Sequence, residues 1–289
     1  MNQNITLLQG NCLDLLRSLP NESIDAVITD VPYGIDFSPW DILHDNKNSA
    51  LMGTSPAQAK SKLFKSRGKP KNGWSKEDRK RTLEFQSFCE DFLSELLRVM
   101  KPCSPLIAFT GRQNQHRFTI ASENVGFIYK DTIAWDKVSA PFRAQNINKV
   151  LEKRGIEPVN GEMRLGNLAP MFEPIIWCFK PYGIGETITD HFIENGLGCF
   201  NSEKHKSNIL RYSARIKDKI HETQKPLELI EDLVEMFTLN GQVVLDPFMG
   251  GGTMGVASVA MGRSFVGIEI ELENFNNASK RIMAAKVRS

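Results

Sequence analysis

The chain has 289 residues, enough for one large α/β domain with smaller additions, and 41% of them are hydrophobic, as in ordinary globular proteins. The net charge of +2 does not by itself indicate a nucleic-acid partner. The cysteines are odd in number and never spaced as CxxC, which argues against a disulfide framework and a zinc site: Cys12, Cys89, Cys103, Cys178 and Cys199. The five histidines also lack metal-ligand spacing, so we expect no metal.

No signal for a membrane or for export is visible. The first ten residues, MNQNITLLQG, lack the basic region and apolar run of a signal peptide. No apolar stretch approaches the roughly 20 residues that a membrane-spanning helix needs. We therefore expect a cytoplasmic protein without a membrane partner.

Short apolar runs alternate with helical patterns along the chain, which predicts βαβ units and an open, mostly parallel sheet. The expected strands are 5–8, 24–29, 106–109, 127–135, 174–179, 242–245 and 264–270. The expected helices are 12–19, 84–100, 113–124, 226–237, 253–261 and 274–285.

Three stretches interrupt this alternation. Residues 38–81 are polar, and ten Lys or Arg residues lie between Lys60 and Arg81, so we expect a mobile basic insertion that contacts phosphates. A solvated loop without that role is the alternative. Residues 138–171 are rich in basic and amide side chains, which can read base edges, and a second irregular stretch runs to residue 220. Within 138–220, residues 138–171 are therefore the candidate for target recognition.

A glycine-rich turn follows the strand that ends at residue 245. Gly250, Gly252 and Gly255 match the pattern GxGxxG, and Glu269 ends the next strand, where an acid can bind ribose hydroxyls. An NAD site is one interpretation, but too few strands follow the turn for a dinucleotide domain. A plain strand-to-helix turn is another. The segment Asp246-Pro247-Phe248 before the glycines favours a third, the AdoMet loop DPFxGxGT of amino-methyltransferases.

The tetrad Asp30-Val31-Pro32-Tyr33 directly follows another predicted strand. An acid at the carboxyl end of a parallel strand projects into the ligand crevice of such folds. The carboxylate of Asp30 and the carbonyl of Val31 or Pro32 can accept the two N–H bonds of an exocyclic amine and direct its lone pair to an electrophile. Tyr33 offers a flat face for a flipped base.

Together these motifs resemble the DNA N6-adenine/N4-cytosine amino-methyltransferase family in its circularly permuted β arrangement, in which the tetrad precedes the AdoMet loop. The resemblance covers residues 5–36, 84–136, 172–180 and 221–285. It includes the segment from Gly10 to Asp14, the segment from His221 to Pro226, which is similar to HPTQKP, and matches to the family's last helix at Phe275, Ala278 and Arg281. It implies a Rossmann-like methyltransferase domain over residues 1–289 with irregular DNA-contacting insertions.

The resemblance also implies the site residues. Asp30, Val31, Pro32 and Tyr33 are the expected catalytic residues. The expected residues around S-adenosyl-L-methionine are Asn11, Cys12, Asp30, Thr223, Gln224, Lys225, Asp246, Pro247, Phe248, Gly250, Gly252, Thr253 and Glu269.

The resemblance implies a bacterial or phage-encoded enzyme that methylates double-stranded DNA by base flipping and direct transfer, and relatives of this arrangement often dimerise. An initial Asp in the tetrad favours adenine N6 over cytosine N4. A catalytically silent DNA-binding subunit and an RNA amino-methyltransferase are further alternatives. Cytosine C5 methylation would need a cysteine nucleophile, and Cys103 precedes its predicted strand, at the end of the sheet away from the cofactor crevice.

Overall fold

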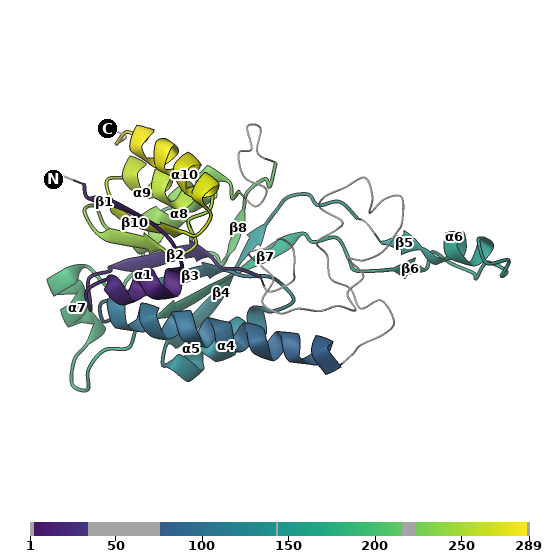
Figure 1. Cartoon of the computed structure of the whole chain (residues 1–289), viewed down its shortest axis with the longest axis horizontal. Coiled ribbons are helices and arrows are strands. Elements are labelled where there is room, and N and C mark those ends of the chain that lie inside the picture. Colours follow the sequence, from purple (N-terminus) through teal and green to yellow (C-terminus); the bar gives the residue numbers. More distant parts are fainter. Residues whose placement is uncertain (1–2, 34–75, 143, 216–223, 288–289) are drawn as a thin grey trace.

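The computed structural model describes residues 3–33, 76–142, 144–215 and 224–287, and their centre is an eight-stranded sheet (Figure 1). Its strand order is β1-β10-β9-β2-β3-β7-β4-β8. All neighbouring pairs are parallel except those of β7, which runs antiparallel to β3 and β4. The strands are β1 (Ile5–Gln9), β2 (Ala26–Asp30), β3 (Pro105–Phe109), β4 (Ile128–Asp136), β7 (Phe172–Phe179), β8 (Ile209–Arg211), β9 (Val243–Asp246) and β10 (Ser264–Glu269).

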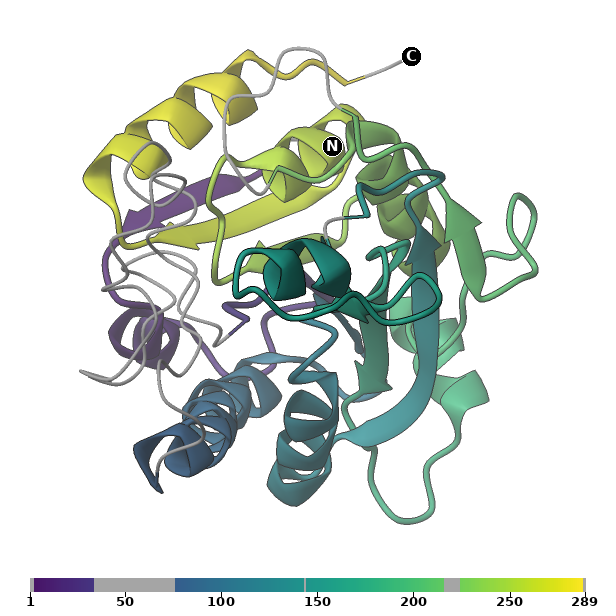
Figure 2. The same cartoon turned by 90° about the vertical axis from the view of Figure 1, so that its right-hand side faces the viewer.

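Helices cover both faces of the sheet, with α1, α4 and α5 on one face and α8, α9 and α10 on the other (Figures 1 and 2). The helices of these layers are α1 (Cys12–Ser18), α4 (Lys76–Val99), α5 (Gln115–Val125), α8 (Leu227–Phe237), α9 (Thr253–Ala260) and α10 (Leu272–Ala284). Within the described ranges, no helix is long and apolar enough to cross a membrane.

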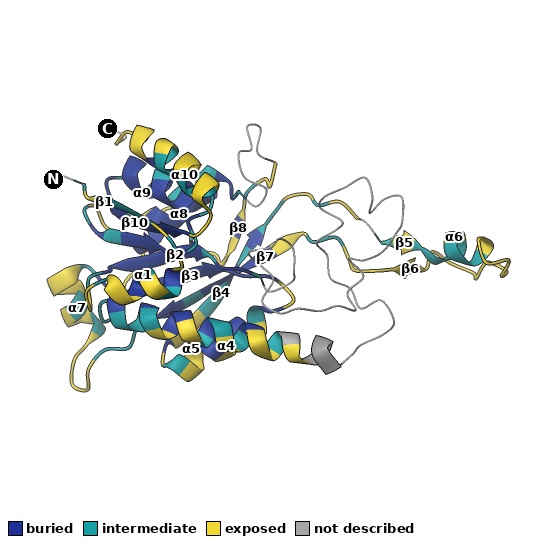
Figure 3. Ribbon diagram, in the orientation of Figure 1, coloured by how far each residue is buried: buried dark blue, intermediate teal, exposed yellow. Residues whose placement is uncertain are grey.

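The central strands are apolar on both faces, as expected of strands covered by helices on both sides. In β2, Val27 packs into the core under α1, α4 and α5, whereas Ile28 packs into the core under α8, α9 and α10. Leu106 and Ile107 of β3 divide in the same way. Figure 3 shows the result as a buried centre with exposed outer helical faces. Replacing a wholly buried residue such as Phe92 by alanine would cost about 3–5 kcal/mol.

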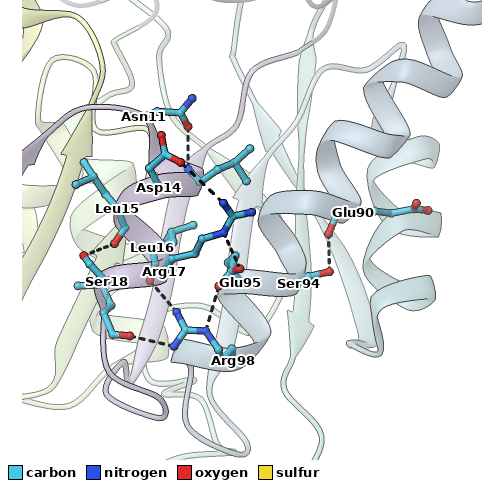
Figure 4. Close-up of polar contacts among 12 residues, drawn as sticks. Asn11, Asp14, Leu15, Leu16, Arg17, Ser18, Glu90, Ser94, Glu95 and Arg98 are labelled. Carbon is cyan, nitrogen blue, oxygen red and sulfur yellow. Dashed lines mark hydrogen bonds and ion pairs between the residues drawn. The ribbon is translucent and has the colours of Figure 1, made fainter.

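Helix α1 is held against α4 by polar contacts at its carboxyl end (Figure 4). The guanidinium of Arg98 donates to the carbonyls of Leu16, at 2.8 Å, and Leu19, at 3.0 Å. The Leu16 carbonyl also accepts the Leu19 amide at 3.0 Å, so Arg98 adds a second donor there and supplies one to the Leu19 carbonyl. At the other end, the Asn11 side chain accepts the Leu13 amide at 2.9 Å and caps the helix. The chain between β1 and α1 is thereby fixed at the edge where β1 ends.

Most predicted elements are confirmed within two residues, but the start of the helix after the basic stretch is wrong. It was predicted at residue 84 and lies at Lys76, so residues 76–81 of the predicted mobile insertion belong to α4. The reason is intrinsic propensity, since Lys, Glu and Arg are good helix formers and no Gly or Pro follows Gly73 there. Residues 38–75 of that insertion lie outside the described residues.

The two stretches predicted to be irregular contain regular structure. The first, 138–171, holds the short pair β5 (Gln145–Asn146) and β6 (Arg164–Leu165) with α6 (Ile147–Glu152) between them, and these elements project from the body as an arm (Figure 1). The second holds α7 (Ile188–Asn195) and β8. Helix α7 has a full capping box between Thr187 and Asp190, a signal readable from sequence.

Candidate active site

Three acidic residues end three adjacent parallel strands. Asp246 ends β9, Asp30 ends β2 and Glu269 ends β10. The strand order β10-β9-β2 brings them to one edge of the sheet, although more than 200 residues separate Asp30 from the other two. Carboxyl ends of parallel strands are the usual ligand-binding edge of open α/β sheets. The predicted tetrad and the predicted glycine loop therefore share one edge.

The side chain of Asp30 makes an ion pair with a buried lysine. The ammonium of Lys225 lies 2.6 Å from Asp30 Oδ2 and also donates to the hydroxyl of Tyr33 at 2.9 Å. The other carboxylate oxygen of Asp30, Oδ1, is buried and has no hydrogen-bond partner among the described residues. An unpaired buried acceptor costs free energy, so Oδ1 is suited to receive a donor from a ligand.

A second carboxylate, Glu173, completes this cluster from β7. It accepts a hydrogen bond from the Tyr33 hydroxyl and lies 3.0 Å from the ammonium of Lys225. Its other oxygen accepts a hydrogen bond from Lys137, which follows β4. Two carboxylates, Asp30 and Glu173, thus face two ammonium groups, a pairing that offsets the cost of burying them.

The pKa shifts follow from burial and from these pairings. Burial raises the pKa of Asp30 and outweighs the opposing effect of Lys225. Burial would also raise the pKa of Glu173, but Lys225 and Lys137 outweigh it and lower that pKa to about 2. Burial acts to lower the pKa of Lys225, yet Asp30 and Glu173 raise it above its usual value. Glu173 is therefore a carboxylate and Lys225 an ammonium at neutral pH.

Tyr33 is held from its backbone as well as from its hydroxyl. The Asn114 side chain donates to the Tyr33 carbonyl at 2.8 Å. A Cβ atom at Gly111 would lie 3.0 Å from the Cβ of Tyr33, so a larger residue there would press on the tyrosine. Val31 and Pro32 are buried, and the Val31 amide donates to the carbonyl of Phe109 at 3.2 Å. The whole tetrad is anchored to β3 and α5.

Asp246 begins the glycine loop and is almost wholly buried. Its Oδ1 accepts the Thr29 hydroxyl at 2.7 Å and the Phe248 amide at 3.1 Å, while its Oδ2 has no partner within the described part of the chain. Burial raises its pKa to about 7 despite these hydrogen bonds. A nearby positive charge would offset this cost.

The rest of the loop is shaped by packing and by Glu269. Gly252 precedes α9 with a φ of 77°, and a Cβ there would lie 2.9 Å from the Cβ of Ala278. Thr253 is the first residue of α9, whose free amide groups favour an anion. Glu269 accepts the Gly250 amide at 2.8 Å and the Glu271 amide at 2.8 Å, and burial raises its pKa. Pro247 and Phe248 connect β9 to these glycines.

The other expected cofactor residues lie at the same edge or outside the described residues. Asn11 and Cys12 follow the end of β1, which pairs with β10 up to Glu269. Burial raises the pKa of the Cys12 thiol to about 11, so it is a neutral group. Gln224 and Lys225 precede α8, and Thr223 lies outside the described residues.

The structure also locates the rival cysteine. Cys103 precedes β3, at the end of the sheet opposite to Asp30, and burial raises the pKa of its thiol to about 11. A neutral thiol far from the tetrad is unsuited to nucleophilic catalysis. In the described ranges, no three or more His, Cys, Asp or Glu side chains form a group that could hold a metal ion.

Comparison with known proteins identifies the family. The family model described as "DNA methylase", which covers N6 and N4 enzymes by its name, matches residues 24–280. The chain belongs to this DNA methylase family. The family prediction is thus confirmed, and the match includes both the tetrad and the glycine loop of the methylase.

Individual relatives agree with this assignment. The methylase is 44% identical to the type II methyltransferase M.HindIII of Haemophilus influenzae, over 92% of this chain and 91% of that one. It is 29% identical to M.HinfI of Haemophilus influenzae, over 97% of this chain and 69% of that one.

Solved structures share the fold at low sequence identity. The Thermus thermophilus protein TTHA0409 matches with a TM-score of 0.60 at 20% identity, over 99% of this chain and 100% of that one. The cytosine-N4-specific PvuII DNA methyltransferase also matches with a TM-score of 0.60, at 18% identity, over 100% of this chain and 89% of that one. The predicted open, mostly parallel α/β fold is confirmed.

Sequence reasoning missed Glu173, Lys137 and Asn114. Glu173 is the second residue of a strand that was expected to begin at residue 174, and the antiparallel direction of β7 is what brings its first residues to the edge where β2 ends. Lys137 reaches the same edge because it follows the carboxyl end of β4, which runs in the same direction as β2 and β3. A charged residue next to a run of buried apolar residues was the available signal.

Proposed function

We propose that the methylase transfers a methyl group from S-adenosyl-L-methionine to the N6 amino group of adenine in double-stranded DNA, by base flipping and direct transfer. The observation that carries this proposal is the buried Oδ1 of Asp30 at the end of β2, which has no hydrogen-bond partner among the described residues and lies beside the loop that starts at Asp246. Family membership supports the reaction class. The initial Asp of the tetrad supports adenine.

The chemistry of the edge fits this cofactor. AdoMet carries a sulfonium, an ammonium, a carboxylate and ribose hydroxyls, and when bound it supplies an electrophilic methyl group. The buried Oδ2 of Asp246 lacks a partner among the described side chains and suits a cationic group. Glu269 suits ribose hydroxyls, and the amide groups at the start of α9 suit a carboxylate.

The tetrad accounts for the activation of the amine. An exocyclic amine is a poor nucleophile because its lone pair is delocalised into the base. Asp30 Oδ1 accepts one N–H bond and a tetrad carbonyl accepts the other, which draws the nitrogen towards tetrahedral geometry. The raised pKa of Asp30, caused by burial, also makes it a better proton acceptor than an exposed aspartate.

The arm supplies a separate DNA-contacting surface. Among its exposed side chains are Lys149, Lys153, Arg154 and Arg164. The guanidinium of Arg164 lies 5.7 Å from the centre of the Phe142 ring and pairs with Glu162. We infer that residues 138–171 read the target sequence, because Arg, Asn and Gln side chains can recognise base edges. The basic stretch 60–81 is proposed to contact phosphates.

The test is transfer of labelled methyl from AdoMet to unmodified duplex DNA, followed by analysis of the methylated nucleoside. The proposal expects N6-methyladenine with the wild-type protein and no product with Asp30→Ala. If the product is N4-methylcytosine, the target base is cytosine and not adenine, and the assignment of the site residues stands. Transfer to RNA alone, or full activity of Asp30→Ala, would overturn the proposal.

A further inference from the structure

The cluster around Lys225 contains one buried carboxylate without a role in the scheme above. Glu173 is 7% exposed, and its contacts lead towards Asp30 rather than towards solvent. Burying a carboxylate is expensive, and an apolar residue at the start of β7 would avoid that cost. The position of Glu173 between a tetrad tyrosine and the lysine that holds Asp30 therefore calls for a functional explanation.

We propose that Glu173 is a positioning residue of the transfer step, which acts through Lys225 and Tyr33 to hold Asp30 with Oδ1 turned to the target amino group. The inference rests on the proposed function. Glu173 need not touch the substrate. It contacts Tyr33, the last residue of the tetrad, directly, and it reaches Asp30, the first residue, through Lys225.

The first contact acts through the ammonium of Lys225. This ammonium lies 2.6 Å from Asp30 Oδ2 and 3.0 Å from Glu173, so one carboxylate fixes the donor that orients the other. With Oδ2 occupied and Oδ1 unpartnered within the described part of the chain, Oδ1 is the acceptor of Asp30 for an incoming N–H group. Without Glu173, Lys225 would keep only Asp30 and Tyr33 as its described polar partners.

The second contact acts through the hydroxyl of Tyr33. That hydroxyl donates to Glu173 and accepts from Lys225 at 2.9 Å, which fixes the far end of the ring. The near end is fixed by Asn114 and by the space left at Gly111. A ring held at both ends is a rigid surface for stacking a flipped base.

Lys137 and the sheet register hold Glu173 itself. Glu173 pairs with Trp135 across the β4–β7 ladder, and Lys137 then reaches the second oxygen of its carboxylate. Both carboxylate oxygens of Glu173 are therefore used, and rotation of the side chain would break three polar contacts. This rigidity is what a positioning residue requires.

The test compares Glu173→Gln with a matched control, Asp232→Asn. Asp232 is also buried and is also bound by a lysine and a tyrosine, Lys204 and Tyr212, but it lies on α8, and none of its hydrogen-bond partners among the described residues belongs to the tetrad. The measurements are the single-turnover rate at saturating AdoMet and DNA, the Kd of each ligand, the pH profile of the rate and the melting temperature.

For Glu173→Gln we expect the single-turnover rate to fall about 10- to 100-fold, with both Kd values within about twofold of the wild type. Glu173 also raises the pKa of Asp30, so the acidic limb of the rate profile should move to lower pH in this variant. Asp232→Asn should change the melting temperature while leaving the saturated rate and the acidic limb unchanged.

Two outcomes would overturn the inference. One is an unchanged saturated rate in Glu173→Gln, even if the Kd for AdoMet rises. The other is that both variants lose the same fraction of the saturated rate and that the acidic limb of the pH profile stays at its wild-type pH in Glu173→Gln. This result would assign Glu173 a purely structural role.

If Glu173→Gln does not fold, Tyr33→Phe tests the same connection. It removes the hydroxyl and keeps the ring, and we expect a saturated rate about 3- to 10-fold lower with unchanged ligand affinities. An unchanged rate would contradict the role of the hydroxyl. Failure of wild-type protein to methylate any DNA would instead contradict the proposed function, so the two failures are distinguishable.

Discussion

The sheet edge around Asp30 and the arm built from β5, α6 and β6 are both polar, but their stability has different sources. At the edge, charged groups are buried and hold one another, as Lys225 does with Asp30 and Glu173. In the arm, side chains are exposed or half-buried and short-range hydrogen bonds provide the order (Figure 3). Asn148, for example, bonds both the amide and the carbonyl of Val159 at 3.0 Å.

The difference matches what each region is proposed to do. Methyl transfer requires reacting groups fixed to fractions of an ångström, and a buried charge cluster resists displacement because each broken contact leaves a charge unpaired. Sequence recognition requires side chains that reach base edges and can be exchanged without unfolding the core. Substitutions at the edge should therefore change rate, whereas substitutions in the arm should change DNA binding.

The largest expected effect is that of Asp30→Asn. The amide keeps the volume of the side chain but removes its charge, and we expect the saturated transfer rate to fall about 10²- to 10³-fold. The Kd for DNA should change by less than about threefold. Asp131→Asn on β4 is the control and should keep the wild-type rate. A loss confined to DNA affinity would contradict the division between edge and arm.

Asp246→Asn tests burial at the edge through the pH dependence of stability. The fold raises the pKa of Asp246 from 3.8 to about 7, so it favours the neutral form. The contribution of the neutral Asp246 carboxyl to the free energy of unfolding is present below pH 3.8 and is lost as the pH rises towards 7. Relative to the wild type, the variant should therefore gain on the order of 4 kcal/mol in free energy of unfolding between pH 4 and pH 8. Denaturant unfolding without AdoMet measures this difference, and a difference independent of pH would contradict the account.

The double variant Lys153→Ala, Arg154→Ala tests the arm. If both cations contact phosphates, the slope of log Kd for DNA against log salt should become shallower by about 2. The Kd for AdoMet and the saturated rate should be unchanged. The matched pair Lys280→Ala, Lys286→Ala, near the carboxyl end of the chain and away from the arm, should keep the wild-type slope. An equal change in both variants would remove the special role of the arm.

The smallest effect is expected for Asn148→Ala. Losing the two bonds to Val159 should cost about 1 kcal/mol locally and leave the melting temperature of the body unchanged. Limited proteolysis should then cleave faster between residues 152 and 160. Faster cleavage in the body instead would show that the arm and the sheet are not independent.

The sequence predicted the parts of the site that lie at carboxyl ends of parallel strands. Asp30 and Glu269 follow apolar runs, and the parallel arrangement alone brings such residues to one edge. Lys137 follows the carboxyl end of β4 and obeys the same rule, whereas Glu173 could not be placed in this way. The position of Glu173 depends on the antiparallel direction of β7, which is decided by tertiary pairing and leaves no mark in the hydrophobic pattern.

The remaining differences have local causes. Helix α4 starts earlier than predicted because charged residues with high helix propensity were interpreted as a solvated loop. Helix α7 was missed although its capping box was visible, since the flanking polar residues hid its short apolar face. The pairing of β5 with β6 involves only two residues in each strand, which is too few for a periodic signal.

The central claim, methylation of adenine N6 through Asp30, is tested most directly in DNA from cells that lack their own adenine methylation. Cells expressing the wild type or Asp30→Ala are compared by sequencing that detects modified bases. The account predicts N6-methyladenine at one short sequence with the wild type and none with the variant. Unmodified DNA with the wild type, or the same modification with Asp30→Ala, would contradict it.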